Sequence, residues 1–112
     1  MPNKAEVFND YRRRMNERIL SEDHAAIKRF FGVDTLAYQS GALDAKTKEL
    51  ILFSLVVHSR CHPCFDAHYQ KARELGIAQA ELDEAAWCAI AMGGAPVKMF
   101  YQECLRRVTS AH

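Results

Sequence analysis

Three residues in the middle of the chain have the types and the spacing that thiol chemistry requires. Cys61 and Cys64 are separated by two residues, and His68 follows the second cysteine by four. A Cys-x-x-Cys pair can close a disulfide within one turn, and residues four apart lie on the same face of a helix. The pair could therefore cycle between dithiol and disulfide, with His68 serving as the acid or base.

The expected position of this pair in a helix also favours reactivity. Pro63 lies between the cysteines, and proline is tolerated only in the first turn of a helix, so a helix is predicted to begin here. The positive end of the helix dipole favours a thiolate and lowers the pKa of a cysteine below its usual value of about 8.5. A thiolate beside a proton carrier, with a second thiol that can resolve a sulfenic acid, is what peroxide reduction requires.

Two other interpretations of the same residues stay open. Cys61, Cys64 and His68, with His58 or His62 as a fourth ligand, have the residue types of a zinc site, although the chain offers no second ligand pair elsewhere. Alternatively, the cysteines and the histidine are core residues without any chemistry.

Composition predicts one domain, covering residues 1–112, whose core needs no disulfide framework because 49% of the residues are hydrophobic. With 15 basic against 14 acidic residues, the net charge of +1 gives no reason to expect nucleic acid or a membrane as a partner. We expect no signal peptide, and the longest apolar run, 50–57, is far shorter than the ~20 residues of a membrane span. We therefore expect a cytoplasmic protein, in which a Cys-x-x-Cys pair is redox-active or metal-binding rather than structural.

Apolar residues recur at helical spacing along the chain and predict an all-α fold of about six helices. The expected helices cover residues 4–20, 22–32, 45–59, 61–76, 79–92 and 96 onward, with a short further helix within 33–40. Asp44 lies where an N-cap belongs, and Gly32 and Gly93-Gly94 are expected to end helices. The helix 45–59 should be the most buried, because its second half is apolar on all sides.

The sequence also predicts which side chains are buried and which are exposed. The residues expected on buried faces include Phe8, Tyr11, Met15, Ile19, Ile27, Phe30, Phe31, Cys88 and Cys104. Trp87 and the methionines are expected in the core or at subunit contacts. Arg12, Arg13 and Arg14 are expected to form a solvated helix face rather than a phosphate site.

Three motifs together resemble a known family. They are Gly-Ala-Leu-Asp-Ala-Lys-Thr-Lys-Glu-Leu-Ile at 41–51, the Cys-x-x-Cys-x-x-x-His at 61–68, and Ala-x-Ala-x-Gly-Gly at 89–94. The sequence resembles the carboxymuconolactone decarboxylase superfamily and, within it, the alkylhydroperoxidase D (AhpD)-like branch. The resemblance implies all-α subunits assembled as a homotrimer or homohexamer. It also implies a peroxiredoxin-type antioxidant oxidoreductase that needs no cofactor.

The resemblance also implies roles for single residues. Cys64 would attack a small-molecule peroxide, Cys61 would resolve the sulfenic acid and meet the reductant, and His68 would accept the proton from Cys64. Glu49 would set the basicity of His68 through a hydrogen bond. The reductant would be a thiol or a lipoyl-type protein. The best-known members carry a second relay histidine directly before the second cysteine, where this chain has Pro63.

The place of Glu49 in this scheme raises a geometric question. Its local pattern, between Lys46 and Lys48, favours a surface charge. It precedes Cys61 by twelve residues, which is about 18 Å along one straight helix. Either the helices fold back so that Glu49 approaches His68, or a neighbouring subunit supplies it.

The sequence thus predicts a thiol-dependent peroxidase or disulfide reductase. One alternative is a decarboxylase-like enzyme acting on a small organic acid, which is the weaker interpretation because the decarboxylase branch lacks the cysteine pair. Another is a non-catalytic protein that binds zinc or senses oxidants.

Overall fold

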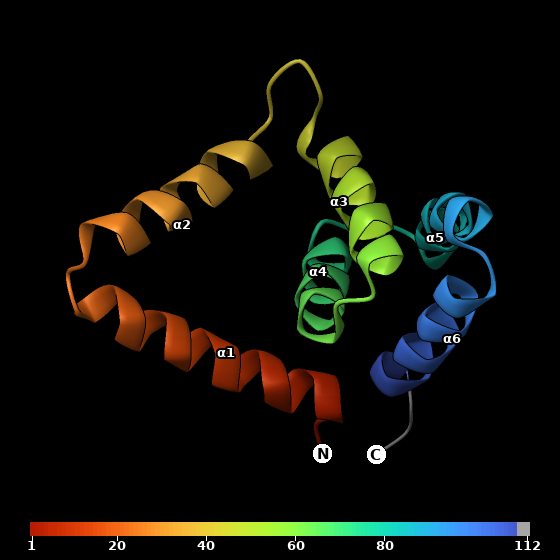
Figure 1. The fold of residues 1–112 in the computed structure, drawn as a ribbon, viewed down its shortest axis with the longest axis horizontal. Helices are drawn as coiled ribbons and strands as arrows, with labels where there is room; N and C mark the ends of the chain where they lie inside the picture. Colours follow the sequence, from red (N-terminus) through yellow and green to blue (C-terminus); the bar gives the residue numbers. More distant parts are fainter. Residues whose placement is uncertain (110–112) are drawn as a thin grey trace.

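The computed structural model describes residues 1–109, which form six α-helices and no β-strand. The helices are α1 (Lys4–Ser21), α2 (Ala25–Tyr38), α3 (Ala45–Ser59), α4 (His62–Glu74), α5 (Gln79–Gly93) and α6 (Ala95–Thr109). In Figure 1, α3 to α6 gather into a bundle, while α1 and α2 form an arm that reaches away from it and returns at α3. The predicted all-α fold is confirmed.

The core lies between α3, α4, α5 and α6, whose apolar side chains interlock. Phe53 of α3 packs against Phe65 of α4 with their ring centroids 5.3 Å apart, and both are fully buried. Burial of such a side chain contributes about 1.5–3 kcal/mol. The buried side chains of α5 and α6 are Leu82, Ala86, Ala89, Ile90, Val97, Phe100, Tyr101 and Cys104. The bundle is thus the rigid body to which the cysteine segment is attached.

Capping residues explain where the central helix begins and how it turns into the next. The Asp44 carboxylate accepts a hydrogen bond from the Thr47 backbone N–H at 2.7 Å, which caps α3 as predicted and lowers the pKa of Asp44. Arg60 ends α3 in the left-handed conformation, with φ of 56°. The chain therefore reverses at Arg60, and α4 packs back against α3.

An ion pair fixes α4 against α6. The two terminal guanidinium nitrogens of Arg107, Nη1 and Nη2, donate to the buried Asp66 carboxylate, at 3.0 and 2.9 Å. The Asn9 side-chain amide of α1 donates to the Asp66 carbonyl at 2.9 Å. Since a buried carboxylate is stable only when it is paired, these contacts hold α4 in one orientation.

The prediction that Gly32 ends a helix is wrong. One uninterrupted helix, α2, runs from Ala25 to Tyr38 and includes the glycine. Glycine costs only about 1 kcal/mol relative to alanine inside a helix, which is too little to break one that the flanking residues favour. The predicted start is also displaced, because Glu22 caps the end of α1 and His24 caps the start of α2.

The predicted buried faces of the arm are only partly correct. No residue of α2 is fully buried, and Phe30 is 63% exposed. The predicted residues that are half-buried are Phe8, Met15, Ile19, Ile27 and Phe31. In α1, Tyr11 is exposed, and the buried residues are Ala5 and Asn9. One contact of the arm with the bundle is polar: the amide of Asn3, the N-cap of α1, donates to the Val108 carbonyl at 2.9 Å.

Further apolar side chains expected inside the protein lie on its surface. Cys88 is exposed, contrary to the prediction, whereas Cys104 is buried as predicted. The exposed large apolar side chains outside the arm include Ile51, Leu55, Trp87, Met92 and Met99. The protomer thus leaves one side of α3 uncovered. No helix within residues 1–109 has the length and apolarity to cross a membrane.

Candidate functional site

The two cysteines lie at the reversal between α3 and α4, and they form a disulfide. Their Cα atoms are 5.2 Å apart. Cys61 is the N-cap of α4, and its sulfur accepts a hydrogen bond from the Cys64 backbone N–H at 3.3 Å. Pro63 occupies the first turn, as predicted. Both cysteines are partly exposed, and Cys64 also packs against the core.

The reversal at Arg60 also brings Glu49 to His68. The Nδ1 atom of His68 and the Oε2 atom of Glu49 are 2.6 Å apart, within one chain. The Glu49 side chain is 3% exposed and that of His68 is 14% exposed. The expectation of a surface charge is therefore wrong for Glu49. Of the two geometric solutions, the folding back of the helices is the one adopted, and no second subunit is needed.

This contact determines which imidazole nitrogen is free. An ionised carboxylate can only accept a hydrogen bond, so Nδ1 carries the proton and donates it to Glu49. The Nε2 atom of a neutral His68 then presents its lone pair away from Glu49. Because His68 lies one turn after Cys64 on α4, the imidazole and the thiol share one face of the helix. The arrangement can hold a base beside the second cysteine.

Tyr38 is a site residue that sequence reasoning missed. It comes from the last turn of α2, and its ring meets that of His68 edge to face, with centroids 5.8 Å apart. Burial raises the pKa of Tyr38, and the carboxylates of Asp34 and Glu49 raise it further. No local pattern identifies Tyr38, since its position depends on α2 continuing past Gly32.

His62 lies on another side of α4. Its ring packs edge to face on Phe100 of α6, with centroids 4.9 Å apart. His62 precedes His68 by six residues, which is about 240° around a helix. The two histidines therefore do not form a relay, and His62 does not take the place that Pro63 leaves. Among residues 1–109, no group of three or more His, Cys, Asp or Glu side chains could hold a metal ion.

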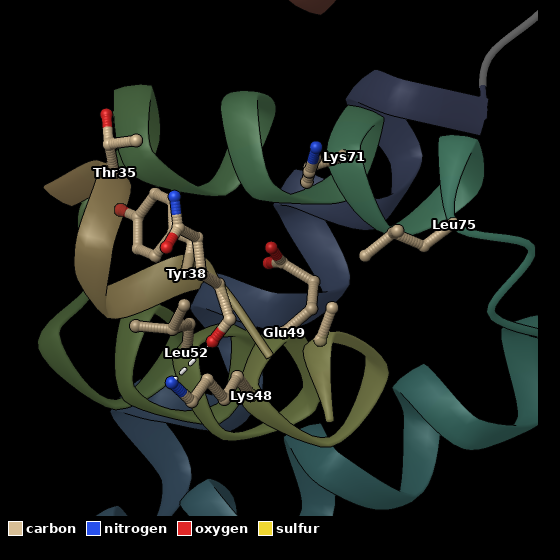
Figure 2. Close-up of a pocket in the computed structure, with 9 residues that line it drawn as sticks. Thr35, Tyr38, Lys48, Glu49, Leu52, Lys71 and Leu75 are labelled. Atoms are coloured by element: carbon tan, nitrogen blue, oxygen red, sulfur yellow. Dashed lines mark hydrogen bonds between the residues drawn. The ribbon is translucent and has the colours of Figure 1, made fainter. Parts of the chain in front are cut away.

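Two cavities flank the Glu49–His68 pair. One, of about 350 Å³, lies between the arm and the α3–α4 pair and is lined by His68, Glu49, Tyr38, Phe31, Arg12 and Lys71, among others. The other, of about 320 Å³, is shown in Figure 2, where Glu49 points from α3 into the space between Tyr38 and Leu75. Arg12 is half-buried in the first cavity, so the prediction of a solvated arginine face does not hold for it.

Comparison with known proteins places this site in a family. The model of the carboxymuconolactone decarboxylase family matches residues 25–101. The match covers α2 to α5 and the first half of α6, so it includes all four predicted site residues, while α1 lies outside it.

Individual relatives agree with this result. A protein of Cupriavidus necator is 36% identical over 81 residues, which are 72% of each chain. A carboxymuconolactone decarboxylase family protein from Legionella pneumophila superposes with a TM-score of 0.86 at 30% identity, over 94% of both chains. A family member from Thermotoga maritima, with a suggested involvement in the antioxidative response, gives a TM-score of 0.82 at 31% identity, over 91% of this chain and 86% of the other.

Proposed function

The chain belongs to the carboxymuconolactone decarboxylase family, and on this premise we propose that it is a thiol-dependent antioxidant oxidoreductase that reduces small organic peroxides. The observation that carries the proposal is the 2.6 Å contact between Glu49 and His68, one helical turn beyond a disulfide. A buried carboxylate that orients a histidine beside a cysteine is the usual arrangement for activating a thiol. The suggested antioxidative involvement of the Thermotoga maritima relative supports the same class.

In the oxidative half-reaction, the reduced protein consumes one peroxide. His68 takes the proton of the Cys64 thiol at Nε2, and the thiolate sulfur attacks the terminal peroxide oxygen. The O–O bond breaks, Cys64 becomes a sulfenic acid, and the alkoxide leaves as an alcohol with the proton from His68. The Cys61 thiol then attacks the Cys64 sulfur, which forms the disulfide and releases water.

The other residues of the site position these groups. Glu49 holds the imidazole through Nδ1, and Tyr38 packs against the ring, so that Nε2 keeps one direction. The cavity beside His68 offers room for the organic part of the peroxide. A dithiol, carried by a small molecule or by a lipoyl-type protein, returns the disulfide to two thiols and closes the cycle.

The test measures which thiols are lost on oxidation. The reduced protein is exposed to one equivalent of cumene hydroperoxide, alkylated, and analysed by intact mass and peptide mapping. We expect two thiols to disappear and one peptide to join Cys61 to Cys64. In Cys64→Ser the peroxide should persist, whereas Cys88→Ser, which removes an exposed cysteine outside the site, should behave as the wild type. If all four cysteines stay alkylatable, the proposal is refuted.

A further inference from the structure

The exposed face around Cys61 carries a positive side chain that has no partner. Arg60 directly precedes Cys61 and is exposed. Within residues 1–109, its side chain makes no hydrogen bond or ion pair; only its backbone N–H is bonded, to the Val57 carbonyl at 3.2 Å. An exposed, unpaired guanidinium therefore belongs to the residue next to the partly exposed Cys61.

Neighbouring elements add two imidazoles to this face. His58 lies in the last turn of α3, and the turn between α5 and α6 packs on it: a Cβ built on Gly93 would lie 3.4 Å from the His58 ring. His62, the residue after Cys61, contacts Phe100 of α6. We call Arg60, His58 and His62 the disulfide face.

Few negative charges oppose this face. No acidic residue occurs between Glu49, which is buried against His68, and Asp66, which is buried against Arg107. On α6 the first acidic residue is Glu103, eight residues beyond Ala95 and so about two turns away from the Gly93 turn. The helix dipoles cancel in pairs, since α4 and α6 begin here while α3 and α5 end here. The side chains, and Arg60 above all, therefore set the local potential.

We infer that the disulfide face selects an anionic thiol as the reductant of the Cys61–Cys64 disulfide, with Arg60 as the residue that determines this specificity. The inference deepens the proposed function, on which it rests, by naming the class of its electron donor. A thiolate that carries a further negative charge is attracted to Arg60 as it approaches the sulfur of Cys61.

The reaction consumes two donor thiols. The first donor thiol gives up its proton, its thiolate attacks the Cys61 sulfur, and the Cys61–Cys64 bond breaks as the Cys64 sulfur leaves and takes up that proton through Nε2 of His68. A second donor thiol attacks the sulfur of the first donor in the mixed disulfide. Cys61 is released as a thiol, and the donor leaves as its disulfide. Two electrons thus pass from the donor to the protein.

The experiment compares three thiols that differ chiefly in charge. The oxidised full-length chain carrying Cys88→Ser is mixed with excess 2-mercaptoethanesulfonate, 2-mercaptoethanol or cysteamine at pH 7.5 and low salt. The rate at which each thiol reduces the protein disulfide is divided by the rate at which the same thiol reduces bis(2-hydroxyethyl) disulfide. This ratio removes differences in intrinsic nucleophilicity between the thiols. We expect the anionic thiol to be favoured over the neutral one by about threefold to tenfold, and the cationic thiol to be the slowest.

Two variants at one position separate charge from backbone effects. Arg60→Gln removes the charge and should abolish the preference, while Arg60→Lys keeps the charge at the same left-handed position and should retain it. Addition of 0.5 M NaCl should reduce the preference in the wild type. Equal normalised rates for the three thiols, or an unchanged preference in Arg60→Gln, would overturn the inference and leave the proposed function standing. Failure of all three thiols to reduce the disulfide would contradict both.

Discussion

At the level of single residues, the contact between Glu49 and His68 is the feature that the proposed chemistry depends on most. Glu49→Gln keeps the size of the side chain and removes the charge that holds the Nδ1 proton of His68. We expect the oxidation of the dithiol by peroxide to slow by about 10- to 100-fold, as for other residues that orient a reactive group. Stopped-flow measurement across a range of pH values tests this.

The shape of the pH profile distinguishes orientation of His68 from a general loss of structure. A positioning role predicts a changed dependence of the rate on pH in Glu49→Gln, with a thermal midpoint close to that of the wild type. Glu84→Gln, at an exposed carboxylate of α5, is the matched control and should change neither quantity. A rate for Glu49→Gln within twofold of the wild type would exclude the relay.

The two cysteines outside the disulfide should differ sharply in reactivity. Cys104 is fully buried, and burial raises the pKa of its thiol to about 11, so at pH 8 only about one part in a thousand is thiolate. Cys88 is exposed. We expect iodoacetamide to modify Cys88 in the folded, oxidised protein within minutes and to leave Cys104 intact until the chain unfolds. Peptide mapping after a short pulse measures both, and comparable labelling of the two would refute the prediction.

At the level of elements, α2 is a continuous helix although none of its residues is fully buried. Its glycine offers a way to stabilise it. Gly32 lies inside the helix, and a Cβ there would meet no atom within 4 Å. Gly32→Ala should therefore raise the free energy of unfolding by about 0.5–1 kcal/mol, because alanine loses less backbone entropy on folding. Urea unfolding followed by circular dichroism measures the change.

Replacement of Gly76 by alanine should have the opposite effect on stability. Gly76 follows α4 with φ of 76°, where a Cβ is strained even though the space around it is open. Gly76→Ala should therefore lower the free energy of unfolding by about 1–2 kcal/mol. The two alanine variants should thus move in opposite directions. A loss of stability in Gly32→Ala would mean that α2 is not a continuous helix.

At the level of the whole molecule, the amount of exposed apolar surface favours self-association. The exposed apolar side chains of α2 and α3 are Phe30, Val33, Leu36, Ile51 and Leu55. A monomer rarely leaves so many large apolar groups uncovered without a partner. We therefore predict that the chain self-associates through these faces, and the family resemblance implies a homotrimer or homohexamer.

Light scattering coupled to size-exclusion chromatography tests this assembly. The double variant Phe30→Ser and Leu36→Ser should shift the mass toward that of one chain at micromolar concentration. Val7→Ser, at an exposed apolar position of α1, serves as the control and should leave the mass unchanged. A wild-type protein that elutes with the mass of a single chain would contradict the prediction.

Local features of the sequence were sufficient for most of the helices and for part of the site. Apolar periodicity predicted α6, the acidic first turn and the glycine pair bounded α5, and the length of the apolar run together with the Asp44 cap predicted α3, because a capping hydrogen bond spans only three residues. The Cys-x-x-Cys and Pro63 located the start of α4 in the same way. These features depend on neighbours within one or two turns, so they can be read from the chain.

The contacts of His68 with Glu49 and Tyr38 depend on tertiary packing. Glu49 and His68 are nineteen residues apart, and their contact exists because the left-handed residue Arg60 reverses the chain and core packing holds α4 against α3. Tyr38 reaches His68 because α2 continues through Gly32, where flanking helix formers outweigh the small cost of one glycine. The residue types and spacing predicted a redox role for the cysteine pair, and helix packing determined that the Glu49 carboxylate and the Tyr38 ring contact its histidine.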